Sequence, residues 1–516
     1  MADVYFTSTD GVTYTRRLYG RERMSAAATR HSDGLGQIVT MGEVELKSYL
    51  TQEKLAPYVK AAWTSLRFTV PWMAVLTTDI DPTDNSFLFT YKVPLDQDEI
   101  DAWTDKTIVW RTEELSFSEW EEVVKRTHWK PGDNRYGFEV HISLTTDGYW
   151  MMGLTAPHWV TDGRGILPVF DQFFKCLQAQ FDGSAPPVNS IRWGEEVIRL
   201  PPTGVRIVPD VGPIPVSMDP PPAQFTRLSR KANEVDPNVE SINRCIVLTK
   251  EQTEAFNLAC KRHRCSITAA INSIFLLADL ETELRCAADS KGDDWDQLLD
   301  SFHQADLFSL PFNVSDVRHF IYPLFTKISQ PCGVGGLINC GFATYHDMNN
   351  IRNCLHVGKD GDIVKNYGPQ SFWDGVVMDT RNVLREAVKT KATAKMYHHL
   401  SATAEAAAAS VRGCQVPWPG VMASSLGSLD KLSLFTRFRP SVSKSDPGTA
   451  FSVRQWRFGI RTAWLCAIAI NTWEYDGVLS LNLQGSSRWQ TQQSWDYFSN
   501  AVTDAFERIT SATSPL

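Results

Sequence analysis

The sequence predicts an α/β protein built from two comparable halves, each a mixed sheet flanked by helices. Helix-like and strand-like patterns alternate along both halves, and the 516 residues are enough for two large domains. Eleven of the 27 prolines lie between Pro186 and Pro237. Because proline cannot continue a helix or donate to a sheet, that stretch predicts an extended crossover. We therefore expect an N-terminal half over residues 1–183, a crossover over 184–243 and a C-terminal half over 244–516.

Six segments of the first half have the pattern of a helix or a strand. Apolar residues keep helical spacing over 55–66, and alternate with polar residues over 138–144. The remaining predictions are strands at 73–80, 87–94 and 149–154, and an amphipathic helix at 166–181 with apolar residues at steps of three and four.

The second half repeats this alternation. A strand is predicted at 244–248, followed by helices at 250–263 and 266–282, the second capped by Ser266 or Thr268. Further strands are predicted at 307–314, 337–345, 451–460, 463–474 and 477–485, and further helices at 376–411 and 491–510.

Composition excludes several function classes. Lys and Arg number 51 and Asp and Glu 59, so the net charge of −8 gives no basic excess for nucleic-acid binding. The ten cysteines begin at Cys176 and lack metal-site spacing, which favours buried, reduced thiols and no bound metal. No apolar run reaches the ~18 residues that a membrane helix needs, and the start lacks the apolar core of a signal peptide. We expect a cytoplasmic monomer without membrane contact.

One segment carries recognisable chemistry. His158-x-x-x-Asp162-Gly163 lies between a predicted strand and a predicted helix. Histidine is the side chain best suited to accept a proton near neutral pH. Asp162 can cap the following helix and pair with a cation, while Gly163 gives the backbone freedom at the helix entry. The plain alternative is a loop histidine with satisfied hydrogen bonds beside a capping aspartate.

Other candidate segments are weaker. The same pattern recurs at His356–Gly361, but no amphipathic helix follows it, so we expect a surface turn. The acidic run at 293–296 indicates a solvated helix start rather than a metal site. His398 and His399 project about 100° apart on a helix, which favours a surface pair. Glycine-rich nucleotide loops and a Gly-x-Ser-x-Gly elbow are missing from the sequence.

The His158 segment resembles the active-site signature of the CoA-dependent acyltransferase superfamily, which includes chloramphenicol acetyltransferase, the plant BAHD enzymes and peptide-synthetase condensation domains. Trp193–Pro202, Leu248–Ala270 and Val421–Gly427 are similar to further parts of that family, the last to a serine-containing loop. In length and in these segments the chain is most similar to the fungal trichothecene 15-O-acetyltransferase-like group. The resemblance covers nearly the whole chain, and the His158 segment is its specific part.

Two departures separate the chain from other branches. The BAHD Asp-Phe-Gly-Trp-Gly motif is missing, and Arg457-Phe458-Gly459 is at most a remnant of it. Condensation domains usually carry two adjacent histidines, whereas Pro157 precedes His158 here.

The resemblance implies two chloramphenicol-acetyltransferase-like domains with a tunnel between them. It further implies transfer of an acyl group, expected to be acetyl, from acyl-CoA as co-substrate to a hydroxyl of a small secondary metabolite. His158 would be the general base, Asp162 would pair with an arginine and hold the loop, and Gly163 would belong to the loop. Ser424, Ser425 and Gly427 would lie near the substrate. Two alternatives stay open: an enzyme that takes its acyl group from a carrier protein, and a catalytically silent small-molecule-binding homologue.

Overall fold

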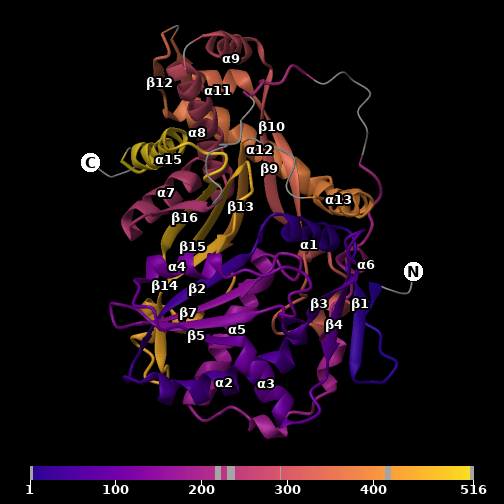
Figure 1. Cartoon of the computed structure of the whole chain (residues 1–516). Coiled ribbons are helices and arrows are strands. Elements are labelled where there is room, and N and C mark those ends of the chain that lie inside the picture. The colour runs from indigo at the N-terminus through magenta and orange to yellow at the C-terminus, as the bar shows by residue number, and fades with distance from the viewer. Residues whose placement is uncertain are drawn as a thin grey trace.

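The computed structural model describes residues 4–214, 222–228, 239–290, 292–358, 360–412 and 420–511. Figure 1 shows two large sheets arranged one above the other, each flanked by helices. This mixed α/β architecture confirms the predicted fold class.

The strands of the described residues are β1 (Thr13–Arg17), β2 (Ile38–Leu46), β3 (Leu76–Asp81), β4 (Ser86–Lys92), β5 (Ile108–Trp110), β6 (Glu139–Leu144), β7 (Trp150–Ala156), β8 (Ser241–Val247), β9 (Leu307–Asp316), β10 (Asn339–Asp347), β11 (Leu355–Val357), β12 (Ile363–Lys365), β13 (Val421–Ser428), β14 (Phe451–Ile460), β15 (Ile468–Tyr475) and β16 (Val478–Ser486). The longer helices are α1 (Arg21–His31), α2 (Gln52–Thr69), α3 (Gln97–Thr107), α4 (Phe117–Arg126), α5 (Gly163–Phe181), α7 (Lys250–Arg262), α8 (Ile267–Ser290), α9 (Asp293–Gln304), α12 (Met378–Lys389), α13 (Ala392–Ala408) and α15 (Gln492–Ser511). Short helical segments are α6 (Gly204–Ile207), α10 (Pro323–Ile328), α11 (Met348–Cys354), α14 (Pro440–Ser443) and the π-helical η6 (Pro369–Val377).

The lower sheet has five strands in the order β14-β2-β7-β6-β5, all antiparallel except the β5–β6 pair. The apolar side of α5 is buried, as its spacing predicts, and α5 packs against α2 and β2. On another side of β2 and β7, α4 forms a separate small core. Strand β7 is buried along its whole length, and it leads directly into the His158 loop.

The upper sheet has six strands in the order β10-β9-β13-β15-β16-β8. Helix α8 is buried along most of its length, because apolar side chains surround it, and it packs against α15. Strand β13 lies between β9 and β15 and is parallel to both.

One strand of the C-terminal half belongs to the lower sheet. Strand β14 pairs with β2 over the register Phe451↔Leu46 to Ile460↔Ile38. Arg457-Phe458-Gly459 lies within this strand. The sequence predicts the strand correctly but gives no sign of its sheet, so sheet membership does not follow the predicted division of the chain.

Two predicted elements differ in the structure. The helix predicted at 376–411 is η6 followed by α12 and α13, with a break where Lys391 takes φ 54°. No glycine or proline marks this break in the sequence. The segment 421–427, expected to be a loop, is the central strand β13.

No single described helix is long and apolar enough to cross a membrane. Helices α7 and α8 pass that test only when taken together, and they are bent by 102° at the break between them.

Candidate active site

His158 lies in a tight turn between β7 and α5. The turn is closed by the Val160 N–H, which donates to the Pro157 carbonyl at 3.0 Å. Between them, the buried indole of Trp159 donates to Thr77 Oγ1 at 2.9 Å and anchors the turn in the core. The Pro157–Val160 hydrogen bond and the Trp159 indole therefore help to fix the position of His158.

A single hydrogen bond fixes the tautomer of His158. Its Nδ1 lies 2.9 Å from the Thr161 carbonyl oxygen, which can only accept. Nδ1 therefore carries the proton and Nε2 carries a lone pair. Burial lowers the pKa of His158, although the Thr161 carbonyl and the Asp162 charge act in the opposite direction. The residue is nevertheless partly exposed, so it borders an accessible space.

A glycine loop packs against the His158 ring. Gly36 has φ +81°, and a Cβ at this position would lie 3.2 Å from His158 Cβ. The Gly36 N–H donates to the Arg461 carbonyl at 2.9 Å, which holds the loop in place. Sequence reasoning missed Gly36, because it lies more than a hundred residues before the motif.

Asp162 has all its hydrogen-bonding capacity engaged away from His158. Its carboxylate accepts from the Gly165 N–H at 2.9 Å, the Ile338 N–H at 2.8 Å and Arg318 Nη1 at 2.9 and 3.1 Å. It caps α5, as the sequence predicts. Burial alone would favour the neutral acid, but the Arg318 guanidinium and the Ile338 and Gly165 N–H groups together outweigh burial and lower the pKa of Asp162. The carboxylate thus ties the motif loop to β10 and to the segment after β9.

Gly163 is required by close packing rather than by its backbone angles. A Cβ at this position would lie 3.0 Å from both Leu426 Cδ2 and Phe458 Cζ, and its φ is not positive. This corrects the expectation of conformational freedom at the helix entry. Gly165, which the sequence did not single out, leaves even less room, because a Cβ there would lie 2.7 Å from Thr161 Oγ1.

The predicted substrate-binding residues lie on strand β13, not in a loop. Successive residues of a strand face opposite sides, so Ser424 and Ser425 cannot both face one site. Ser425 lines a cavity of about 500 Å³, which Ser424 does not. Gly427 has φ +81° at a bulge in the β13–β15 register, and Arg164 Nη1 donates to the adjacent Leu426 carbonyl at 2.5 Å.

The 500 Å³ cavity has a cationic side and a hydroxyl side. Arg381, Arg385 and Lys389 line it at steps of four along α12 and so share one helix face. Ser266 and Thr268, at the start of α8, contribute hydroxyl groups. Sequence reasoning missed the three cations, although their spacing in a predicted helix was a readable signal.

Strands β9 and β13 connect this cavity with the His158 loop. On β9, Ser315 lines the cavity and the next residue, Asp316, pairs with Arg318 at 3.2 Å. On β13, Ser425 lines the cavity and the next residue, Leu426, packs against Gly163. Consecutive residues of these two strands therefore line the cavity and contact the motif loop or its partner Arg318, while the motif residues themselves do not line the cavity.

A larger cavity of about 1080 Å³ lies at α1, α13 and the segment 205–214. None of the predicted catalytic residues lines it. His398 and His399 do, and His398 Nε2 lies 3.0 Å from the Val208 carbonyl oxygen. Helix α13 contributes to both cavities, since its Thr393 lines the smaller one and its Lys395 the larger one.

The remaining candidate segments show no competing site. His356 is exposed on the β11–β12 hairpin, and the acidic run at 293–296 begins α9. The described residues contain no cluster of His, Cys, Asp or Glu able to hold a metal. Burial raises the pKa of the Cys176 thiol to about 11.

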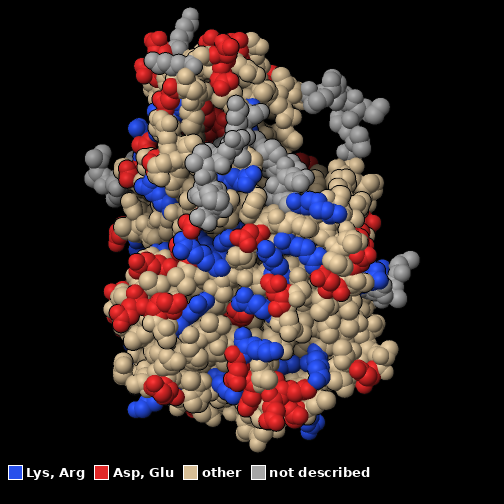
Figure 2. Space-filling model, in the orientation of Figure 1, with Lys and Arg blue, Asp and Glu red and all other residues tan. Residues whose placement is uncertain are grey.

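Charged side chains are unevenly distributed over the surface. Figure 2 shows Lys and Arg gathered across the middle of one face, where the upper and lower sheets meet, and Asp and Glu concentrated toward the ends. The charge on this face therefore differs between its middle and its ends.

No family model matches the sequence, and no curated protein matches it. Solved structures do match the fold. TRI3 trichothecene 15-O-acetyltransferase from Fusarium sporotrichioides superposes with a TM-score of 0.71 at 14% identity, over 99% of each chain. TRI101 from F. sporotrichioides, solved with coenzyme A and T-2, gives 0.55 at 10% identity, over 94% of this chain and 97% of its own.

The condensation domain of the Monacolin K polyketide synthase MokA also gives a TM-score of 0.55, at 8% identity and over 98% of each chain. The resemblance predicted from the His158 segment is thus confirmed at the level of the fold. The chain has the two-domain fold shared by CoA-dependent acetyltransferases and condensation domains.

Proposed function

We propose that this protein is an acyltransferase that moves an acyl group, expected to be acetyl, from acyl-CoA to a hydroxyl of a small acceptor. The observation that carries the proposal is the tautomer of His158. Its Nδ1 is occupied by the Thr161 carbonyl, so Nε2 holds a lone pair, and the residue is partly exposed. A neutral histidine of this kind is suited to take a proton from a hydroxyl.

The reaction follows from that lone pair. His158 Nε2 accepts the proton of the acceptor hydroxyl while the oxygen attacks the thioester carbonyl carbon. The carbonyl π electrons move to oxygen and form a tetrahedral oxyanion, which a donor such as the Ser425 hydroxyl or a backbone N–H stabilises. When the oxyanion collapses, the carbon–sulfur bond breaks, and the CoA thiolate recovers the proton from His158.

Asp162 supports this reaction without touching the substrate. Its carboxylate is fully buried and already bonded to Arg318, Gly165 and Ile338. It therefore has no capacity left to share with a reacting group. We assign it to holding the loop that presents His158.

The smaller cavity suits the CoA co-substrate. CoA carries phosphate groups at one end and its thiol at the end of a long arm. Arg381, Arg385 and Lys389 offer charge for the phosphates, and Arg385 makes no hydrogen bond or ion pair with a described residue. The arm would then follow β9 and β13 toward His158.

We assign the larger cavity to the acceptor, although His158 itself lines neither cavity. The larger cavity is lined by Lys395, His398 and His399 of α13, whereas the smaller cavity is lined by Thr393. An acceptor could therefore bind without displacing CoA. Both substrates would then be present together, and proximity contributes to the rate.

The proposed test is incubation of the protein with acetyl-CoA and an extract of hydroxylated secondary metabolites. Mass spectrometry should find products that have gained one acetyl group. His158→Ala should lower turnover by about 10²–10⁴-fold, the usual contribution of a positioned general base.

His356→Ala is the matched control, because His356 begins the second copy of the sequence pattern but is exposed on a hairpin. It should keep wild-type turnover. Full activity of His158→Ala would refute the assignment of the base. Activity only with an acyl-loaded carrier protein would favour a condensation-like enzyme, and ligand binding without turnover a silent homologue.

A further inference from the structure

A line of hydrogen bonds runs from Asp379, on α12, to the wall of the 500 Å³ cavity. Asp379 Oδ2 lies 3.1 Å from His346 Nδ1, and His346 Nε2 lies 2.9 Å from Thr344 Oγ1. Asn313 Nδ2 donates to the same Thr344 oxygen at 2.9 Å. Asn272 Nδ2 donates to Asn313 Oδ1 at 2.7 Å. We call these five side chains the Asp379–Asn272 relay.

The relay crosses the interior of the upper half. His346 is 0% exposed, Thr344 2%, Asn313 4% and Asn272 5%, whereas the Asp379 carboxylate is 22% exposed. Its members come from α12, β10, β9 and α8. Buried polar side chains are costly unless every partner is present, so a line this long is held in one arrangement by its own bonds.

The carboxylate at the outer end sets the tautomer of His346. A carboxylate only accepts, so Nδ1 carries a proton, and Nε2 of the neutral ring accepts from the Thr344 hydroxyl. The Thr344 oxygen then accepts from the Asn313 amide, whose own oxygen accepts from Asn272. This sequence leaves the carbonyl oxygen of Asn272 as the acceptor at the inner end of the relay.

Asn272 and Asn313 both line the cavity that we assign to CoA. We propose that the relay fixes Asn272 Oδ1 as a hydrogen-bond acceptor for an amide N–H or hydroxyl of the pantetheine arm of acyl-CoA. This inference rests on the proposed function. In this arrangement the α12 cations bind the phosphates, and Asn272 recognises the uncharged arm. Asp379 acts as a positioning residue, because it reaches the ligand only through the relay.

Removal of the Asp379 carboxylate would leave the tautomer of His346 undetermined. His346 Nδ1 could then accept a proton from Thr380 Oγ1, which lies 3.5 Å away, and Nε2 would donate to Thr344. Thr344 would then lose the acceptor of its hydroxyl proton, and the Asn313 and Asn272 side chains would be held less firmly. A ligand N–H would meet an acceptor that is no longer fixed toward the cavity.

The test uses the full chain and titration calorimetry with two probes. CoA carries both phosphates and the pantetheine arm, whereas adenosine 3′,5′-bisphosphate carries phosphates without the arm. Asp379→Ala and Asn272→Ala should each weaken CoA binding by about three- to tenfold, the effect of one hydrogen bond. Neither variant should change the affinity for the bisphosphate.

Asp374→Ala is the matched control, because it removes an exposed carboxylate five residues earlier. It should leave both affinities unchanged. Equal weakening of both probes by Asp379→Ala would overturn the proposal, since general distortion of the cavity would explain it. Unchanged CoA binding in Asp379→Ala would overturn it as well. A wild-type protein that does not bind CoA would refute the proposed function itself.

Discussion

At the scale of single residues, the proposed chemistry depends on the unprotonated Nε2 atom of His158. The Thr161 carbonyl keeps a proton on Nδ1, and burial disfavours a second proton on Nε2. Because burial lowers the pKa of His158 below its ordinary value of 6.5, the ring is neutral at pH 7. The base is therefore ready without any further activation.

This leads to a prediction about pH. A general base works only when neutral, so kcat/KM should stay level as the pH falls to 6.5 and should decline below it, as His158 becomes protonated. The measurement is the pH dependence of kcat/KM for the acceptor. An acid limb that begins above pH 6.5 would contradict a buried neutral base.

A second prediction separates Asp162 from the chemistry. Asp162→Ala removes one partner of the buried Asp162–Arg318 pair and the cap of α5, and should destabilise the fold by about 3–5 kcal/mol. Thermal unfolding followed by circular dichroism should show a clearly lower melting temperature together with a lower rate. Lost activity at an unchanged melting temperature would instead place Asp162 in the reaction.

The sequence identified His158, Asp162 and Gly163 because they are close together in the chain. Their spatial partners were beyond its reach, since Arg318 is 156 residues from Asp162. The reason for Gly163 was also hidden, because the side chains that exclude a Cβ come from β13 and β14. Local patterns show which residues share a loop, but not what packs against it.

At the scale of elements, helix α12 supplies the cations of the proposed CoA site. Arg381, Arg385 and Lys389 recur every four residues and line one cavity. That spacing was visible in the sequence, but the site was not, because the facing surface comes from α8, β9 and β13. The central position of β13 was not visible in the sequence either, because its strand partners β9 and β15 lie elsewhere in the chain. Its small and polar residues also resemble those of a loop.

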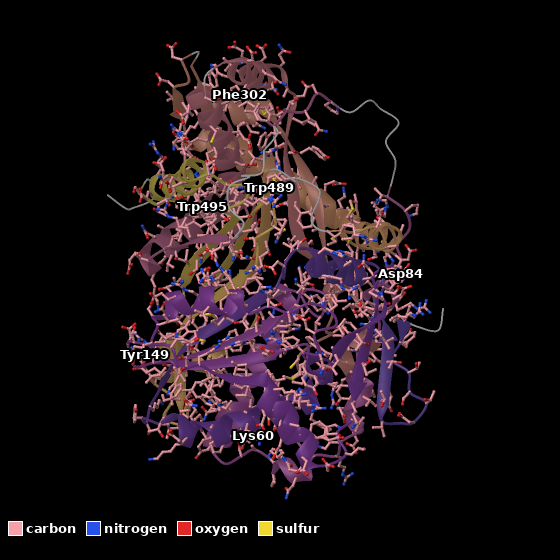
Figure 3. All side chains as sticks on the ribbon, in the orientation of Figure 1. Lys60, Asp84, Tyr149, Phe302, Trp489 and Trp495 are labelled. Atoms are coloured by element: carbon pink, nitrogen blue, oxygen red, sulfur yellow. The ribbon has the colours of Figure 1, made fainter. Side chains whose placement is uncertain are left out.

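Helix α12 gives the third prediction. Arg385→Ala should weaken CoA binding about tenfold, because an unpaired guanidinium beside a phosphate forms a charge-assisted hydrogen bond. Lys60→Ala is the control, since Lys60 is exposed on α2 at the opposite end of the molecule (Figure 3). Calorimetric titration measures the affinity of each variant for CoA, and a second salt concentration shows how far the affinity depends on charge. Equal affinities for CoA in the two variants would remove α12 from the site.

At the scale of the whole molecule, the two halves are interlocked. Strand β14 belongs to the lower sheet, and Asn482 of β16 donates to Glu121 of α4 at 2.6 Å across the two halves. The sequence predicted two comparable α/β layers, and the structure confirms them. The pairing of β14 with the lower sheet could not be predicted, because a strand pattern does not show which strand it pairs with. The C-terminal half holds the His158 loop through Arg318, Leu426 and Phe458.

The proposed function requires that the acyl group passes directly from bound acyl-CoA to the bound acceptor. No serine or cysteine lies in the His158 turn at 157–160, and burial makes the Cys176 thiol, the nearest in sequence, inert at neutral pH. In the proposed function, His158 activates the acceptor while acyl-CoA is bound in a separate cavity. A reaction of this kind has a sequential rate law.

The most direct test is the initial-rate pattern with both substrates varied. Double-reciprocal plots should intersect, and free CoA should inhibit competitively against acyl-CoA only. Parallel lines, with an acyl group carried on the protein after mixing with acyl-CoA alone, would show a covalent intermediate and contradict direct transfer.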